Sequence, residues 1–449
     1  MSISITLPTT YNLSIGKNMI TLSGITQSDR LYLAQVLIDG VSASTIETPP
    51  NPALNGHMDI SRIVKANLSD DNVERIAGFT NSTNTILEYK IRYGEKIGST
   101  QSFTATSSSR YVVNGYKTET QLLWNYDPYL PASNTFDECL GGGNANVRIS
   151  SLYKSLTNYP QLNNTPSYFI YDDEYQTQSI LNVISQSRGT FPADNFNKHP
   201  WAVKYTYFDE SGSTLGYRIK TINELNGAGP FTDSCTLGTL DTRERILHLP
   251  SGTQNLKDWG VFYTQSNPSS YRVSVFTKDN CVGCSTGWSE AQQNAALLDE
   301  IFRFNFTIKS NCSPFKPVRF SFRNAYGMRD YMTFTMRNTE VEDIEREMFY
   351  KNIGTWDKAT YTIPDMDRGH QVYATNVEKT YTAQTDFMDQ DKSPWLLELF
   401  RSPDVKVFFD GSFFPVVIMS NQYEVKDWGR ENLFRYTIEF RSAYKPQIQ

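Results

Sequence analysis

At 449 residues the chain is longer than one hydrophobic core usually serves, so we expect two or three domains, each able to fold without a metal or a disulfide. Hydrophobic residues make up 39%, charged residues 20% and aromatic residues 13%, a balance that favours sheets with polar turns over helical bundles. The net charge of −6 is spread along the chain without a Lys/Arg run, which argues against direct binding of nucleic acid.

The N-terminus, the hydropathy and the cysteines bear on where the chain resides. Residues 1–7 alternate apolar and polar without a basic region before them, so they predict a strand and not a signal peptide. No stretch approaches the roughly 18 apolar residues of a membrane span. Five widely spaced cysteines do not resemble a disulfide framework, and we expect free thiols at Cys139, Cys235, Cys281, Cys284 and Cys312. A soluble protein made in a cytoplasm is the expectation.

Residues 1–120 are expected to form a β-sandwich, because short alternating runs are separated by turn residues. The clearest runs are 19–22, 31–38 ending at Asp39-Gly40, and 85–93 ending at Gly94. One short helix is predicted over 59–68, with the following apolar residues on a single face: Ile60, Ile63, Val64 and Leu68.

Residues 121–317 predict a β-rich middle domain with long loops. It opens with the aromatic, proline-punctuated stretch 124–131, and 141–144 and 226–230 are glycine-rich turns. Its one longer helix is predicted over 289–302, beginning after Ser285 or Thr286. The apolar stripe of that helix consists of Ala291, Ala295, Leu298 and Phe302.

Residues 318–449 predict a C-terminal antiparallel β domain. Strands 319–323 and 331–336 are joined by a turn, and a short helix is expected over 394–401 with Ser393 as its cap. Asp410-Gly411 predicts a type I′ turn between strands 405–409 and 412–419, because both residues tolerate positive φ. We expect 405–409 to be an open edge strand that pairs with a neighbouring molecule.

The closing strand alternates most regularly and is expected to share a core with the short helix. One face of this strand consists of Phe434, Tyr436, Ile438 and Phe440, and the other of Arg435, Thr437, Glu439 and Arg441. The helix residues expected to cover the apolar face are Trp395, Leu396, Leu399 and Phe400. The fold class predicted from all three regions is mainly β, either all-β or β-rich α+β.

The segment Cys281-Val282-Gly283-Cys284 is the one pattern that resembles a metal or redox motif. A zinc site needs two further ligands, and Cys312 and His248 match no standard spacing for them. A redox role requires the motif at the start of a helix, whereas the expected helix begins later. A structural turn is the favoured interpretation, with a metal site and redox chemistry as alternatives.

No motif for catalysis or cofactor binding is evident. The cluster Asp172-Asp173-Glu174 offers two carboxylates, as glycosidases use, but bracketed by tyrosines it predicts a solvated turn. No nucleophile motif accompanies any of the four histidines, which are His57, His199, His248 and His370. The glycines at 141–143 lack the Lys-Ser/Thr of a phosphate-binding loop. We therefore predict a chain that is not an enzyme, with no cofactor and with no catalytic, cofactor-binding or metal-binding residues.

Loop aromatics allow three interpretations, namely core packing, a subunit interface and a carbohydrate surface, of which core packing is favoured. The residues concerned are Trp124, Tyr126, Tyr129, Trp259, Phe262, Tyr263 and Trp288.

The last ~130 residues carry an order of aromatic and proline positions that resembles virion structural proteins of tailed bacteriophages of Bacteroidota, including crAss-like phages. The matching segments are 320–327, 330–334, 350–352, 395–405, 414–418 and 434–440. The N-terminal sandwich matches loosely, and the middle region lies outside the resemblance. The resemblance implies a tail, collar or baseplate protein of the virion, synthesised in the host bacterial cytoplasm, and carries over no active-site residue.

Two further classes of function remain beside the structural one. We expect a ring-forming subunit whose partners are copies of itself and other tail, collar or portal proteins, including tail fibres. The alternatives are a host-receptor or carbohydrate-binding tail protein and a capsule depolymerase. Binding of glycans without cleavage would indicate a receptor-binding or carbohydrate-binding protein, and release of cleavage products would indicate a depolymerase.

Overall fold

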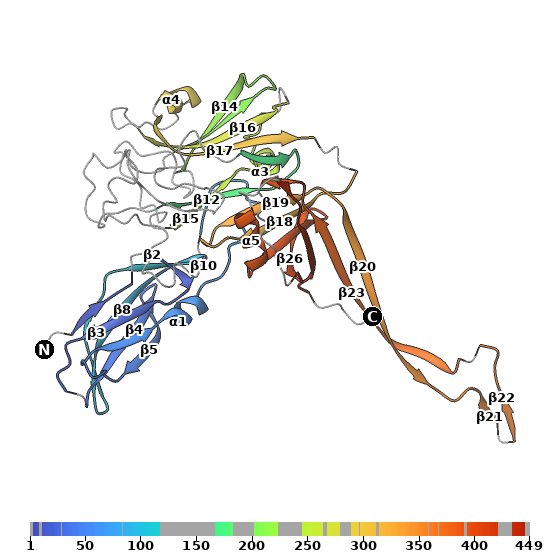
Figure 1. Cartoon of the computed structure of the whole chain (residues 1–449), viewed down its shortest axis with the longest axis horizontal. Coiled ribbons are helices and arrows are strands. Elements are labelled where there is room, and N and C mark those ends of the chain that lie inside the picture. Colours follow the sequence, from blue (N-terminus) through green and yellow to red (C-terminus); the bar gives the residue numbers. More distant parts are fainter. Residues whose placement is uncertain are drawn as a thin grey trace. The chain divides into compact units, whose positions relative to one another are not determined.

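The computed structural model describes residues 3–8, 11–27, 29–82, 84–116, 167–182, 202–222, 245–263, 267–278, 289–295, 297–310, 314–357, 359–366, 368–389, 393–420 and 433–444. These residues are organised mainly into β-sheets, which confirms the expected fold class. The chain forms two compact units (Figure 1): unit 1 contains residues 1–311 and 323–330, and unit 2 contains 312–322 and 331–449. None of the helices in the described ranges is long and apolar enough to cross a membrane.

Unit 1 begins with the expected β-sandwich. One sheet has the order β1 (Ser4–Thr6), β3 (Met19–Ser23), β6 (Gly56–Asp59). The other has the order β2 (Tyr11–Ile15), β10 (Arg110–Tyr116), β8 (Ile86–Ile97), β4 (Leu31–Ile38), β5 (Val41–Thr48), with β9 (Thr100–Thr106) paired to β8. Apolar side chains of both sheets, among them Ile20, Leu22, Val36 and Ile91, form one buried cluster.

Of two local predictions in the sandwich, one is confirmed and the other is wrong. The short helix is confirmed as α1 (Ser61–Ala66), which buries Val64. Gly94 was expected to end a strand, but β8 continues to Ile97, and Gly94 lies opposite a β-bulge in β9. A Cβ there would lie 1.9 Å from the carbonyl oxygen of Ser102, so the bulge requires glycine.

The rest of unit 1 contains two sheets and two short helices, α3 (Thr253–Asp258) and α4 (Glu290–Ala295). One sheet has the order β11 (Ser167–Tyr171), β17 (Leu297–Lys309), β16 (Ser270–Lys278), β13 (Ala202–Phe208), β14 (Thr214–Thr221), and the other β12 (Thr177–Asn182), β15 (Arg245–Pro250), β7 (Thr80–Asn81). Their apolar cluster includes Tyr271 and Phe306 together with Val113 of the sandwich and Tyr326. The first two regions expected from the sequence therefore share one continuous core.

The helix predicted over 289–302 is wrong beyond its first turns. The structure has α4 (Glu290–Ala295), and β17 begins at Leu297. Ser289 starts the helix through a capping box, in which its Oγ accepts from the Gln292 N–H at 3.3 Å and its own N–H donates to the Gln292 Oε1 at 2.9 Å. Beyond the helix the alternation of period two decides the structure, since Phe304 and Phe306 are buried on one face of the strand.

Unit 2 is built on a seven-stranded sheet. Its order is β19 (Arg329–Phe334), β18 (Val318–Arg323), β25 (Val405–Phe409), β26 (Ser412–Ile418), β28 (Thr437–Ser442), β23 (His370–Gln384), β20 (Asn338–Tyr350). Two short pairs complete it, β21 (Thr355–Asp357) with β22 (Thr360–Thr362) and β24 (Met388–Asp389) with β27 (Leu433–Phe434). Strand 405–409 was expected at an open edge, but β25 lies between β18 and β26, so that prediction is wrong.

The helix α5 (Ser393–Arg401) and the closing strand share a core as expected. Phe320 and Phe322 point to the same face of β18, where Phe320 contacts Phe440 at 5.1 Å and Phe322 contacts Trp395 at 5.8 Å between ring centroids. The predicted alternation is confirmed, because Ile438 and its neighbours on that face are buried. The strand itself is interrupted, and its first residues pair with β24 instead.

Candidate assembly surface

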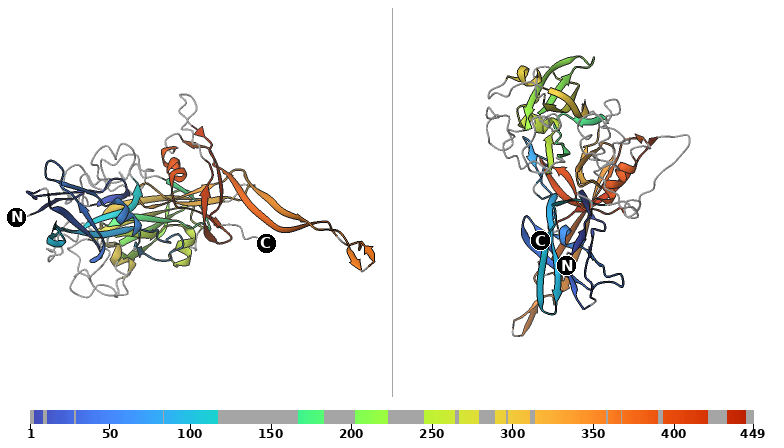
Figure 2. Two further views of the ribbon diagram at one scale, coloured as in Figure 1. Left: turned by 90° about the horizontal axis from the view of Figure 1, so that it is seen from below. Right: turned by 90° about the vertical axis from the view of Figure 1, so that its left-hand side faces the viewer.

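The clearest candidate for a functional surface is a long hairpin of unit 2 that we call the arm, residues 338–384. Its strands β20 and β23 pair antiparallel along their whole length with one bulge, and Figures 1 and 2 show them running out from their sheet to β21 and β22. In the described part of the chain, β28 adjoins β23 only at residues 380–384, so the rest of the arm is two-stranded. Isolated two-stranded hairpins are only marginally stable in water, which favours a partner that covers the arm.

One side of the arm, which we call the apolar face, presents large apolar side chains to solvent. Residues directly opposite one another share a face, and here Ile344 lies opposite Val377 and Met348 opposite Val372. Tyr350 continues this face and is 77% exposed. The exposed apolar residues of the whole arm are Val341, Ile344, Met348, Phe349, Tyr350, Ile353, Trp356, Tyr361, Ile363, Met366, Val372 and Tyr373.

The other side of the arm, which we call the acidic face, carries Asp343, Glu345, Glu347 and Glu378. Asp343 lies directly opposite Glu378, a like-charge arrangement that destabilises a hairpin. Arg441 of β28 pairs with Glu378, whereas no basic residue among those described pairs with Asp343 or Glu345. A basic surface of a partner would relieve this repulsion.

Charge is concentrated in the arm. Residues 338–384 contain nine acidic and five basic residues, so their net charge is 5 − 9, or −4. The net charge of the whole chain is 42 − 48, or −6. Lys379 lies between Glu340 and Glu342, at 2.8 and 2.6 Å, and these hydrogen bonds raise the pKa of the Lys379 ammonium. The hydroxyl of Tyr373 donates to Glu347, which raises the pKa of that tyrosine. These pairs are exposed, so they add little stability to the arm.

The described histidines lie in three different environments. His57 is exposed, with its Nδ1 3.0 Å from the Thr21 hydroxyl. His370 is in the arm, where its ring lies 4.1 Å from that of Tyr350. His248 is buried in β15, and His199 lies outside the described residues.

His248 belongs to a serine–histidine–aspartate arrangement that the sequence did not indicate. Ser179 of β12 lies opposite His248, with its Oγ 2.9 Å from Nδ1, and the Nε2 lies 3.8 Å from the Oδ2 of Asp71. The residue types are those of hydrolase triads. Ser179 and His248 are buried and Asp71 is half-buried, however, so the arrangement has the character of a cross-strand polar network at the margin of a core. No local signal could have found it, because the three residues lie far apart in the chain.

Asp71 is the centre of that network. Its Oδ2 accepts from the hydroxyls of Ser82 at 2.5 Å and Thr85 at 2.8 Å, and its Oδ1 accepts from the Asn84 N–H at 3.1 Å. Burial would raise the pKa of Asp71, but the nearby His248 ring and the hydrogen bonds from Ser82 and Thr85 outweigh burial and hold this pKa well below its usual range.

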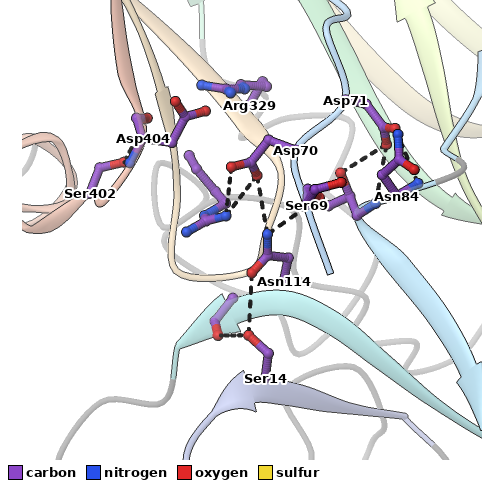
Figure 3. Close-up of polar contacts among 12 residues, drawn as sticks. Ser14, Ser69, Asp70, Asp71, Asn84, Asn114, Arg329, Ser402 and Asp404 are labelled. Atoms are coloured by element: carbon purple, nitrogen blue, oxygen red, sulfur yellow. Dashed lines mark hydrogen bonds and ion pairs between the residues drawn. The ribbon is translucent and has the colours of Figure 1, made fainter. Parts of the chain in front are cut away.

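Asp70 forms a second network inside unit 1. It accepts from the Nη1 of Arg323 at 2.7 and 2.8 Å and from the Nδ2 of Asn114 at 3.3 Å, and the Ser14 hydroxyl donates to Asn114 (Figure 3). Arg323 opens segment 323–330, whose Ala325 carbonyl also accepts from the N–H of Tyr116 at 2.9 Å. These bonds fix the segment in unit 1, which gives the network a structural role.

The acidic cluster has the solvated-turn role expected of it at two of its three residues, because Glu174 is buried, and three of the loop aromatics lie in described residues. Asp172 and Asp173 lie exposed in the turn after β11, while the Glu174 carboxylate accepts from the Tyr171 N–H at 3.0 Å. The rings of Trp259, Phe262 and Tyr263 pack against the core of unit 1, which confirms core packing for these three.

Several residues singled out in the sequence lie outside the described ranges, namely 124–131, 141–144, 226–230, Trp288 and all five cysteines. Within the described ranges, no three His, Asp or Glu side chains gather closely enough to hold a metal ion. The arm was not predicted, although segment 340–350 alternates with a period of two and mixes acidic with apolar residues. No protein-family model matches the chain, and no curated protein matches its sequence.

Proposed function

We propose that this chain is a non-catalytic structural subunit that assembles with copies of itself through the arm into a closed ring. The resemblance in the last ~130 residues favours the tail, collar or baseplate of a tailed bacteriophage as the location of this ring, beside other tail proteins. The observation that carries the proposal is the arm, a two-stranded hairpin with twelve large apolar side chains exposed.

The exposed area of the arm fits an assembly role. An aromatic side chain buries about 150–250 Å², so Tyr350 and Trp356, each about three-quarters exposed, offer roughly 300 Å² together. With the ten further exposed apolar residues, which lie on both sides and at the tip of the arm, the arm offers on the order of 1,000 Å² of apolar surface in total. An interface with this area on one partner reaches the size of stable oligomer contacts.

A ring is the closed form of an assembly that uses the arm in this way. An extended element of one copy that binds a different surface of the next makes a head-to-tail contact, which produces a ring when the rotation closes. A ring covers every arm identically, whereas a filament leaves arms uncovered at one end.

The test measures the assembly state of the purified full-length chain by analytical ultracentrifugation. The double variant Ile344→Lys/Met348→Lys places two charges on the apolar face, and we expect it to sediment as a monomer while wild type self-associates. Val41→Lys is the matched control, because Val41 is 71% exposed in another hairpin and this variant should assemble normally. A monomeric wild type, or a double variant that assembles normally, would contradict the proposal.

The virion assignment has a test of its own. Quantitative mass spectrometry of purified phage particles should detect the chain in multiple copies, in an integer ratio to the portal subunit. A single copy per particle, or absence from the particle, would refute this part of the proposal.

A further inference from the structure

Unit 1 has a cationic surface on the outer face of the sheet β11–β17–β16–β13–β14. The core side of this sheet is apolar, and alternate residues on the other side carry Lys204, Arg272, Arg303 and Lys309. We call these four residues the cationic face. Arg303 pairs with Glu300, so these four cations and this carboxylate together carry 4 − 1, or +3.

Most of these cations are held by neutral groups. Three of the four lie over aromatic rings, at these distances from the ring centroid: Lys204 4.7 Å from Tyr217, Arg272 5.3 Å from Phe208, and Lys309 3.9 Å from Phe169. Arg272 also donates to the amide oxygen of Asn305 at 3.1 Å, and Arg303 alone pairs with Glu300. Aromatic and amide partners orient a cation without neutralising it.

Partial burial leaves these charges poorly solvated. Burial, followed by repulsion from Arg303, lowers the pKa of Arg272, and burial lowers the pKa of Lys204. Lys309 and the Phe169 ring beneath it remain open, with Phe169 53% exposed. A face of oriented, under-neutralised cations on aromatic rings is suited to binding carboxylates.

The acidic face of the arm has the complementary charge and spacing. Asp343 and Glu347 are four residues apart on one strand, or about 13 Å at the usual rise of about 3.3 Å per residue. In the sheet, Arg272 lies opposite Asn305, and Lys309 is four residues beyond Asn305, again about 13 Å along the strands. Both surfaces are sheet faces, so the carboxylates of one can meet the cations of the other over this length.

We propose that the acidic face of the arm in one copy of this chain binds the cationic face of unit 1 in a second copy. This inference rests on the proposed assembly role of the arm and names the surface that receives it. The contact joins two different surfaces, and charge makes it selective, because arm against arm brings carboxylates together.

The experiment uses full-length chains with reversed charges and measures the association constant by analytical ultracentrifugation. The arm variant is Asp343→Lys/Glu345→Lys, and the face variant is Arg272→Glu/Lys309→Glu. Each variant alone should associate about tenfold or more weakly than wild type, because like charges then meet. A 1:1 mixture of the two should regain association, because each variant offers the charge that the other needs.

Controls separate this specific contact from a general effect of charge and from misfolding. Lys17→Glu and Asp29→Lys reverse exposed charges elsewhere in unit 1 and should associate like wild type. Arg272 is half-buried, so a glutamate at this position can destabilise unit 1. The single variant Lys309→Glu changes an exposed residue and tests the same contact without this effect. Raising the salt from about 0.01 M to about 1 M shortens the Debye length from about 30 Å to about 3 Å and should weaken wild-type association.

The outcomes distinguish the two proposals. If Lys309→Glu and the face variant associate like wild type while the apolar-face variant, Ile344→Lys/Met348→Lys, is monomeric, the arm binds another surface and this inference is overturned. If the apolar-face variant also associates normally, the assembly role of the arm fails as well. Retention of wild type on sulfated dextran that is lost in Lys309→Glu, with unchanged self-association, would assign the cationic face to an acidic polysaccharide instead and would overturn the inference.

Discussion

Replacing Asp71 by Asn tests whether the buried network around this carboxylate stabilises unit 1. The best amide rotamer keeps its oxygen toward the Ser82 and Thr85 hydroxyls and turns its NH2 toward the Asn84 N–H, which then loses its acceptor. A hydrogen bond to a charged group contributes about 1.5–3 kcal/mol and one between neutral groups about 1 kcal/mol. The variant weakens the bonds from Ser82 and Thr85 and loses the bond from Asn84. At this partly exposed site we expect a total loss of about 2–3 kcal/mol in the free energy of unfolding. Urea denaturation, followed on the unfolding transition of unit 1, measures this loss.

The pH dependence of the Asp71→Asn effect gives a second measurement. The folded pKa of Asp71 lies below the unfolded value of about 3.9, so its contribution is fully present above that value and is lost as the pH falls through the folded pKa. The stability difference between wild type and variant should thus be constant above about pH 5 and narrow below about pH 4. Asp173→Asn, in an exposed turn, is the control and should change stability by less than about 0.5 kcal/mol. An equal, pH-independent loss in both variants would refute the reasoning.

Three further predictions concern packing and metal content. Gly115→Ala places a Cβ 2.3 Å from the Ala325 carbonyl oxygen and should destabilise unit 1 by about 1–3 kcal/mol in thermal unfolding. Gly78→Ala is the control and should leave the stability unchanged, because the nearest atom to its Cβ lies 3.9 Å away. Equal effects of the two variants would contradict this packing. Ile438→Asp buries an unpaired carboxylate in unit 2 and should cost about 3–5 kcal/mol, so unchanged unfolding would reject the strand assignment. Elemental analysis should find no stoichiometric zinc, and zinc lost together with stability in Cys281→Ser/Cys284→Ser would prove the opposite.

Local chemistry made parts of the fold predictable. Asp39-Gly40 and Asp410-Gly411 both form the expected turns, with φ of 49° and 82° in the first and 44° and 80° in the second. These values belong to the turn that joins right-twisted strands, and few residue pairs adopt them at low cost. The closing strand was predictable for a similar reason, since Ile438 and its alternate neighbours can be buried in one register only.

Features that depend on distant residues were not predictable. Strand 405–409 has no local sign of being central in its sheet, and its position is set by β18, more than 80 residues earlier in the chain. The stripe over 289–302 fits a helix as well as a strand until Phe304 and Phe306 extend the alternation. The contact between Ser179 and His248 likewise depends on strand pairing that no local pattern specifies.

The net charge of the chain does not reveal that positive and negative side chains lie on separate surfaces. A total of −6 without basic runs argued against direct binding of nucleic acid, yet the cationic face with Glu300 carries +3 and the arm −4. Alternate residues of a strand point to opposite sides of the sheet, so cations that alternate with apolar residues all lie on one face. Such cations form no continuous run of charge in the sequence. If copies of the chain assemble as proposed, two surfaces of opposite charge favour contact between unlike surfaces over contact between like ones. The distribution of charge over the faces of each sheet, and not the net charge of the chain, therefore determines which surfaces attract one another.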